Sequence, residues 1–251
     1  LIISHTKHMA LFIQLEKKYC QAAKKIITVG NTLSNYFKRQ YAPIPCDTVF
    51  NGFEPNDFPT ISRKKHKNHV SFATFGKFSL SKSSINIDRL MTAIQRICTA
   101  NGTFVSFNFI GELSEKEVSM IGQLASNTRS TIAISPHVNK SEGLAFLSDH
   151  IDYMIFLGVE NEPTIISSKL FDFINLGIPI IGICKGNEAE QLIQETQTGE
   201  TCGFSADDIT RLLEKAVQKK IYFNPLRIKI NQYTRENQAK RLESMLLPLL
   251  Q

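Results

Sequence analysis

The chain lacks any apolar run close to the ~20 residues that a membrane-spanning helix needs. No secretory signal is visible, although the chain opens at Leu1 rather than at methionine. The cysteines are widely spaced and contain no C-x-x-C pair, so they support neither a disulfide framework nor a zinc centre. They are Cys20, Cys46, Cys98, Cys184 and Cys202. We therefore expect a reducing, cytoplasmic setting.

The sequence also lacks the motifs of several common enzyme classes. It contains neither a G-x-G-x-x-G fingerprint nor Walker spacing, so it predicts neither a dehydrogenase nor a P-loop protein. No Ser/His/Asp constellation and no histidine pair stands out as a nucleophilic or metal site. We therefore expect no metal and no bound cofactor.

The chain carries a moderate excess of positive charge. Lysine and arginine outnumber aspartate and glutamate by 29 to 23, a net charge of +6. Such a charge serves solubility in general, and it also suits an anionic ligand or a peripheral contact with an anionic inner membrane face. The densest basic run, Arg63–Lys67, holds no aromatic residue that could stack on a base. We interpret it as a solvated linker and expect no nucleic-acid partner.

The order of predicted elements indicates the fold class. A hydrophobic content of 42% over 251 residues suits a large core. Strands alternate with helices, which predicts an α/β fold: a Rossmann-like parallel sheet with helices on both faces. Strands are expected at 26–29, 48–50, 69–75, 104–110, 131–134, 153–157, 178–184 and 203–204. Helices are expected at 9–25, 33–39, 86–100, 114–125, 144–148, 168–176, 188–196, 207–219 and 227–250.

Two helix starts carry a capping signal. Asn31 and Thr32 are expected to cap the helix at 33–39. Ser114 and Glu117, three residues apart, predict a capping box.

The segment from Ile151 to Cys184 carries the strongest indication of function. It reads as a buried strand, a loop, a short helix and a second buried strand. Ligands of α/β sheets bind outside the carboxyl ends of the strands, and a helix beginning there at Ser168 could bind a phosphate. Asp172, one turn further, could accept hydrogen bonds from a sugar diol. The alternative is that Ser167 or Ser168 is only an N-cap and Asp172 only a solvated residue.

A second candidate site is the loop after the strand at 69–75. Gly76 permits close approach of the backbone, and Lys77 and Lys82 could each meet a phosphate oxygen as a point charge. The alternative is an ordinary surface loop of lysine and serine. His137 stands at the tip of a strand, where a lone histidine is more often surface than catalyst.

In this order the segments resemble the C-terminal, donor-binding half of a family 4 (group 1) glycosyltransferase of the GT-B architecture. The resemblance spans nearly the whole chain. It is carried by Ile26–Gly30 with the following helix, by the hinge-like Val49–Phe58, by Phe107–Gly111, and by Pro163–Pro179 with its continuation Glu188–Ile193.

The resemblance implies roles for individual residues. Lys77 and Lys82 stand where the family has the two basic residues that grip the donor diphosphate, and they would stabilise it as it departs. Asp172 would hold the ribose, and the loop from Ser135 to Asn139 would frame the base. The implied donor-binding residues are Gly76, His137, Val138, Thr164, Ser167, Ser168, Lys169 and Asp172.

The chain departs from the family's pattern in two places. The family has a glutamate followed eight positions later by a second, but here these positions hold Thr164 and Asp172, with Glu162 as the nearby acid that could substitute in catalysis. The family also has a complete acceptor-binding domain. We expect residues 1–60 to be the end of that domain and the hinge, 66–226 the nucleotide-sugar-binding domain, and 227–251 a C-terminal crossing helix. The chain alone would then be an inactive fragment.

The resemblance implies a retaining glycosyltransferase that takes a nucleotide sugar and an unidentified acceptor, in surface polysaccharide or glycolipid synthesis. Two alternatives stay open. One is a nucleotide-sugar epimerase of the same architecture. The other is a non-catalytic protein that binds a nucleotide or a partner chain, which Thr164 favours.

Overall fold

A computed structural model describes residues 2–59, 69–77, 85–99, 104–126, 130–135 and 138–250. The basic run at 63–67 and the candidate residues Lys82 and His137 lie outside these ranges.

The strands are β1 (Ile26–Thr28), β2 (Cys46–Thr48), β3 (His69–Phe75), β4 (Phe104–Ile110), β5 (Thr131–Ser135), β6 (Tyr153–Leu157), β7 (Ile180–Ile183) and β8 (Gly199–Cys202). The α-helices are α1 (Ile2–Ala22), α2 (Asn31–Gln40), α3 (Ile85–Thr99), α4 (Glu115–Ser126), α5 (Lys140–His150), α6 (Lys169–Leu176), α7 (Glu188–Thr196), α8 (Ala206–Val217), α9 (Arg227–Asn231) and α10 (Arg235–Leu246). Two short 3-10 helices are η1 (Pro55–Asp57) and η2 (Leu247–Leu249).

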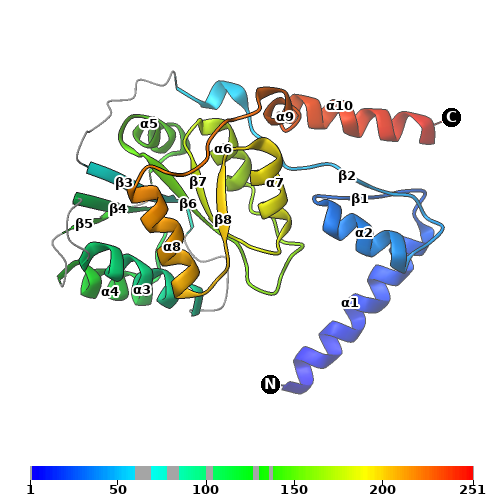
Figure 1. The fold of residues 1–251 in the computed structure, drawn as a ribbon. Helices are drawn as coiled ribbons and strands as arrows, with labels where there is room; N and C mark the ends of the chain where they lie inside the picture. The colour runs from blue at the N-terminus through cyan, green and yellow to red at the C-terminus, as the bar shows by residue number, and fades with distance from the viewer. Residues whose placement is uncertain are drawn as a thin grey trace.

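Six strands form one parallel sheet in the order β5-β4-β3-β6-β7-β8 (Figure 1). β3 pairs with β4 over its whole length, from His69 opposite Phe104 to Phe75 opposite Ile110, and pairs with β6 on its other side. The chain therefore winds outward in both directions from β3 and β6. Ligands of such sheets bind at this switch point, outside the carboxyl ends of the strands.

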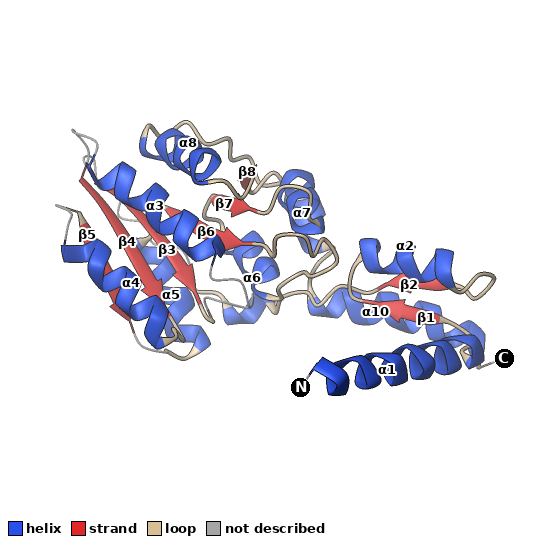
Figure 2. Ribbon diagram, turned by 90° about the horizontal axis from the view of Figure 1, so that it is seen from below, coloured by secondary structure: helices blue, strands red, loops and turns tan. Residues whose placement is uncertain are grey.

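Helices cover both faces of this sheet (Figure 2). α5, α6 and α7 pack on one face, around Ala73 and Met154 of the central strands. α3, α4 and α8 pack on the other face, around Phe72 and Tyr153. Successive residues of a strand point to opposite faces, so each strand supplies both cores. The predicted class, a Rossmann-like parallel sheet with helices on both faces, is confirmed.

Several predicted elements are found at the expected residues. The strands at 69–75, 104–110 and 153–157 and the helix at 188–196 have the predicted bounds. The capping box is present as well: the Ser114 amide donates to the Glu117 carboxylate at 2.6 Å, and the Glu117 amide donates to the Ser114 hydroxyl at 3.3 Å. These signals depend on residues close together in sequence.

Other predicted elements are wrong in position. The last strand lies at 199–202 rather than 203–204, because β8 pairs with β7 from Gly199, where a Cβ would lie 2.0 Å from the Ile180 carbonyl oxygen. The predicted helix at 144–148 begins earlier, at 140, because the Asn139 side chain accepts a hydrogen bond from the Glu142 amide at 2.8 Å. The predicted single helix at 227–250 is two helices, since Thr234 starts α10 as its N-cap.

The strands β1 and β2 form a separate parallel pair, with Ile26 opposite Cys46. We call residues 23–48 the N-terminal lobe. Figure 1 shows this lobe apart from the six-stranded sheet, with α1 projecting from it. The side chains of Phe12, Ile13 and Tyr19 on α1 are exposed. No helix within the described ranges is both long and apolar enough to cross a bilayer.

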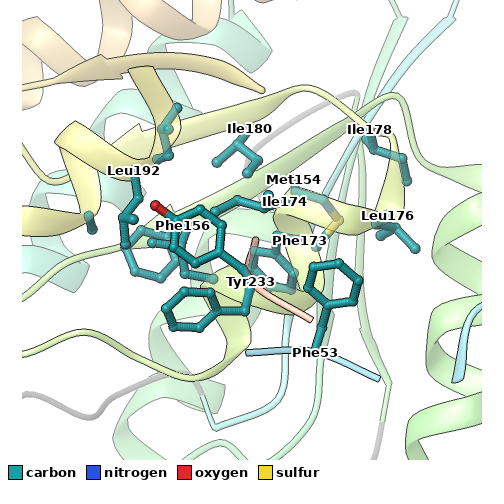
Figure 3. Packing of buried hydrophobic residues seen from close by; sticks show 14 of the residues in the cluster. Phe53, Met154, Phe156, Phe173, Ile174, Leu176, Ile178, Ile180, Leu192 and Tyr233 are labelled. Atoms are coloured by element: carbon teal, nitrogen blue, oxygen red, sulfur yellow. The ribbon is translucent and has the colours of Figure 1, made fainter. Parts of the chain in front are cut away.

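Residues 49–59, here called the hinge segment, connect the lobe to the large sheet. The Phe53 amide donates to the Tyr233 carbonyl at 2.9 Å, and the Arg235 amide donates to the Phe53 carbonyl at 2.8 Å. Gln238 of α10 accepts a hydrogen bond from the Phe50 amide at 2.8 Å. Figure 3 shows Phe53 and Tyr233 together at one side of the buried cluster. The turn between α9 and α10 therefore holds the hinge segment against the core of the large sheet.

Candidate functional site

The loops that follow β3 and β4 approach each other closely at the carboxyl edge of the sheet. Gly76 has φ +84 and Gly111 has φ +131, a region that favours glycine. The Gly76 amide donates to the Ile110 carbonyl at 2.8 Å. A Cβ on Gly111 would lie 2.4 Å from the Gly76 carbonyl oxygen. Both positions therefore favour glycine, Gly111 most strongly because its Cβ would meet backbone, and together they place the backbone of the loop that holds Lys77.

Lys169, the first residue of α6, lies over this loop. Its Nζ donates a hydrogen bond to the Lys77 carbonyl oxygen, and a Cβ on Gly76 would lie 2.6 Å from the Lys169 Cε. The Lys77 ammonium is itself exposed and pairs with Glu112 at 3.3 Å. The structure thus brings the loop after β3 and the start of α6 to one place, because β3 and β6 are neighbouring strands.

The positive charge of Lys169, unlike that of Lys77, is not paired with an acid among the described residues. Burial lowers the pKa of Lys169 most strongly, and the neighbouring charge of Lys77 adds to this effect, so that the pKa is about 8. Among the described residues no carboxylate pairs with the Lys169 ammonium, which donates to a backbone carbonyl instead. A partly buried cation of this kind favours an anion as its partner.

The start of α6 leaves backbone donors available. Ser168 stands at the N-cap position with helical dihedrals, φ −56 and ψ −26, and its hydroxyl makes no capping hydrogen bond. The amides of Leu170 and Phe171 donate to the carbonyls of Ser167 and Ser168, at 3.0 and 3.2 Å. The amides of Ser168 and Lys169 have no acceptor among the described residues. The helix therefore presents two amides that a phosphate could use.

Asp172 lies one turn into α6 and is not a solvated residue, so that alternative is wrong. Its side chain is 17% exposed, and its Oδ1 lies 2.9 Å from the Nζ of Lys140, the first residue of α5. Burial raises the pKa of the Asp172 carboxyl, and the hydrogen bond from Lys140 works against that rise. The predicted ribose-binding acid is thus held by a cation from the neighbouring element.

The loop before α6 carries Thr164, at the position of the family's first glutamate, and Glu162, the nearby acid that could substitute for it. Glu162 is exposed, and its carboxylate makes no hydrogen bond or ion pair with any described residue. Thr164 is half-buried, next to Pro163, whose carbonyl accepts a hydrogen bond from the Glu188 amide at 3.3 Å. The catalytic role of Glu162 and the sugar contact of Thr164 stay predictions.

Glu188 links this loop to the N-terminal lobe. Its buried carboxylate accepts hydrogen bonds from the amides of Asn31 and Thr32, at 2.5 and 2.8 Å. The N-cap position of α2 is Gly30, so the prediction that Asn31 and Thr32 cap this helix is wrong. The acceptor comes instead from α7, 157 residues away in sequence.

The predicted base-framing loop is described only in part. Val138 is half-buried and packs on the core beside Phe75, while His137 lies outside the described residues. Lys82 lies outside them as well, so its predicted contact with a diphosphate stays a prediction. Within the described ranges, no group of three or more His, Cys, Asp or Glu residues could hold a metal ion.

Sequence reasoning missed two charged residues of this edge, Lys140 and Glu188. A signal for Lys140 existed, because Asn139 followed by Glu142 is a helix-start pattern that would have put Lys140 at the carboxyl edge. For Glu188 no such signal exists, because its partners are backbone amides of a distant segment.

Solved structures with a similar fold include glycosyltransferases of GT-B architecture. A lipopolysaccharide outer core galactosyltransferase, WaaB, matches 90% of this chain with a TM-score of 0.67 and 13% identity. A glycosyltransferase from Rickettsia africae matches 94% of the chain with a TM-score of 0.67 and 12% identity. An α,α-trehalose-phosphate synthase (UDP-forming) from Burkholderia vietnamiensis matches 94% with a TM-score of 0.66 and 10% identity.

At these identities the likeness establishes the fold alone. This chain spans 62%, 67% and 61% of the length of those three proteins, respectively. No protein-family model matches the sequence, and no curated protein matches it. The fold therefore places this chain among proteins that contain a Rossmann-type half like that of GT-B glycosyltransferases.

Proposed function

We propose that this chain is the donor-binding half of a retaining glycosyltransferase, which takes its sugar from a nucleotide sugar. The observation that carries the proposal is the convergence of Lys169, the Lys77 loop and the start of α6 at the switch point of the sheet. A partly buried ammonium and two available amides form a cradle for a doubly charged diphosphate. One structural neighbour is a UDP-forming synthase, which is consistent with such a ligand.

In the proposed reaction, the bond between the anomeric carbon and the diphosphate oxygen breaks, and its electron pair goes to the diphosphate. An acceptor hydroxyl forms the new bond on the same face of the sugar, and its proton goes to a diphosphate oxygen. Lys77, Lys169 and, from the resemblance, Lys82 stabilise the charge that develops on the leaving group. The dipole of α6 adds to this effect because its positive end faces the diphosphate. Asp172 holds the ribose.

A binding experiment tests the first step. UDP, GDP, ADP and CDP are titrated into the chain without added magnesium, by calorimetry and thermal shift. We expect one of them to bind and to raise the melting temperature. The proposal fails if none binds.

Lysine variants test the location. We expect Lys82→Ala to weaken diphosphate binding by ~1–3 kcal/mol, the range for a charged hydrogen bond. Lys220→Ala is the control, since this exposed lysine follows the end of α8, at the opposite edge of the sheet. Equal affinity of the Lys82 variant and the control would contradict the assignment.

The non-catalytic alternative is supported by one observation, the threonine at position 164 where the family has its first glutamate. In that case the chain would bind a nucleotide without transferring a sugar. Transfer of a labelled sugar by the intact protein, and its loss in Glu162→Gln, would support catalysis. Nucleotide binding without transfer or epimerisation of any labelled donor would support the alternative.

A further inference from the structure

Lys140 joins three elements at the carboxyl edge of the sheet. Its Nζ lies 2.9 Å from Asp172 Oδ1 on α6 and 2.9 Å from Asp57 Oδ2 on η1 in the hinge segment. Lys140 itself begins α5, where the Asn139 side chain caps the helix. No other described residue forms an ion pair with the Asp172 carboxylate.

Asp172 depends on this contact. Its side chain is 17% exposed, and a buried carboxylate without a partner is costly. Burial raises the pKa of the Asp172 carboxyl most strongly, and the charge of Asp57 also raises it. The hydrogen bond and the charge of Lys140 lower this pKa, and so does the charge of Arg235 of α10 from further away. Lys140 is therefore the group in direct contact that favours the charged, oriented form of this acid.

The contact leaves part of the carboxylate available. Each carboxylate has about four lone-pair positions, and Lys140 takes up one of them, on Oδ1. The second oxygen, Oδ2, accepts no hydrogen bond from any described residue. A diol that approaches Asp172 would thus find a fixed acceptor rather than a freely rotating one.

We propose that Lys140 is a positioning residue of a ribose-diol subsite: it holds the Asp172 carboxylate in the orientation that accepts hydrogen bonds from the 2′- and 3′-hydroxyls of the nucleotide. This inference rests on the proposed function. Asp57 of the hinge segment pairs with the same ammonium from the other side, but the contact that orients Asp172 is the one from Lys140.

The test measures preference for the diol. UDP and GDP are compared with their 2′,3′-dideoxy analogues by calorimetry, for the wild type and for Lys140→Met, Lys140→Arg and Asp57→Asn. We expect the wild type to bind the ribonucleotide at least roughly tenfold more tightly than its dideoxy analogue, the effect of one charged hydrogen bond. In Lys140→Met this ratio should fall to within about twofold of unity, because the acceptor is no longer held.

Two variants separate positioning from a general effect on folding. Lys140→Arg keeps a cation beside Asp172 and should restore the preference. Asp57→Asn removes the other ion pair and should leave the preference unchanged, while its melting temperature falls with that of Lys140→Met. If Lys140→Met does not fold, Lys140→Gln and Asp172→Asn replace it, and each should lose the preference.

The outcomes distinguish this inference from the proposed function. A preference that persists in Lys140→Met overturns the role of Lys140 and leaves the proposed function intact. If the wild type binds the ribonucleotide and its dideoxy analogue equally tightly, the ribose-diol subsite is overturned, while the proposed diphosphate binding stands. If the wild type binds neither ribonucleotide nor analogue, the proposed function fails and this inference fails with it.

Discussion

At the scale of single residues, the loop that carries Lys77 depends on Gly76 and Gly111, whose positive φ angles favour glycine. Gly111 has φ +131, and a Cβ there would lie 2.4 Å from the Gly76 carbonyl oxygen. The clash is with backbone, which cannot rotate away as a side chain can. The loop that carries Lys77 can thus take this position because Gly76 and Gly111 have no side chains.

Gly111→Ala should therefore lower the free energy of unfolding by ~2–4 kcal/mol, through backbone strain and the clash. Urea denaturation followed by circular dichroism measures it. Gly122→Ala is the control, because a Cβ there meets nothing within 4 Å, and in a helix alanine should stabilise by about 0.5–1 kcal/mol. Equal stability of the two variants would contradict the proposed loop geometry.

Lys169 should make nucleotide binding depend on pH. Burial and Lys77 lower its pKa to about 8 in the free protein, and a bound diphosphate favours the charged form. Above pH 8 the free protein must take up a proton to bind, so affinity should fall as pH rises, by at most about tenfold per pH unit. Calorimetric titrations from pH 7 to 9.5 measure this slope.

Lys169→Arg provides the comparison, since a guanidinium stays protonated throughout this range. The nucleotide affinity of this variant should change little between pH 7 and 9.5, even if it differs from that of the wild type. If the variant and the wild type lose affinity in parallel, another group is responsible for the pH dependence.

At the scale of elements, helix α2 has no cap of its own. The Gly30 residue before it has no side chain to offer, and Glu188 of α7 accepts hydrogen bonds from its first two amides, Asn31 and Thr32. A negative charge at a helix start also interacts favourably with the helix dipole. A buried carboxylate therefore links the N-terminal lobe to the large sheet, in addition to the hinge segment.

Glu188→Gln should weaken this junction by ~1–2 kcal/mol, because the amide side chain keeps one acceptor, brings a donor towards the helix start and loses the charge. Hydrogen exchange at the Asn31 and Thr32 amides should become faster. Glu214→Gln, on the exposed face of α8, is the control and should leave exchange at α2 unchanged. Unchanged protection in Glu188→Gln would show that the lobe is held by other contacts.

At the scale of the whole molecule, the C-terminal part of the chain holds the hinge segment. The ring of Tyr233 lies 5.3 Å from that of Phe50 and 5.5 Å from that of Phe171, measured between centroids. The Lys24 ammonium near the end of α1 donates to the Leu249 carbonyl at 3.3 Å. Segments from both ends of the sequence thus meet beside the N-terminal lobe (Figure 2).

Tyr233→Ala should cost ~3–5 kcal/mol of unfolding free energy, since it empties a buried aromatic position between the hinge segment and α6. Chemical denaturation with fluorescence detection measures the loss. Tyr222→Ala is the matched control: this tyrosine is 56% exposed, so its removal should cost under about 1 kcal/mol. A similar small loss at Tyr233 would contradict the view that this turn stabilises the hinge.

The sequence predicted the elements better than the site. The strands that contain Phe72, Phe107 and Phe156 were located because a short apolar run bounded by turn residues is a local pattern. β8 was misplaced because Gly199 and its neighbours are not apolar, and only pairing with β7 makes them a strand. At the candidate site, Gly76 and Asp172 were predicted from their places after a strand and in the first turn of a helix, whereas their closest contacts were not predicted.

By itself, the sequence determined the parallel α/β class, most element positions, the capping box at Ser114 and the segments that reach the carboxyl edge. These follow from sterics, hydrogen bonds and periodicities between residues that are near one another in the chain. Only the tertiary structure decided that Lys140 holds Asp172, that Lys169 lies over the Lys77 loop and that Glu188 caps α2. Such pairings depend on strand order and on the packing of the hinge segment, which no local stretch of sequence contains.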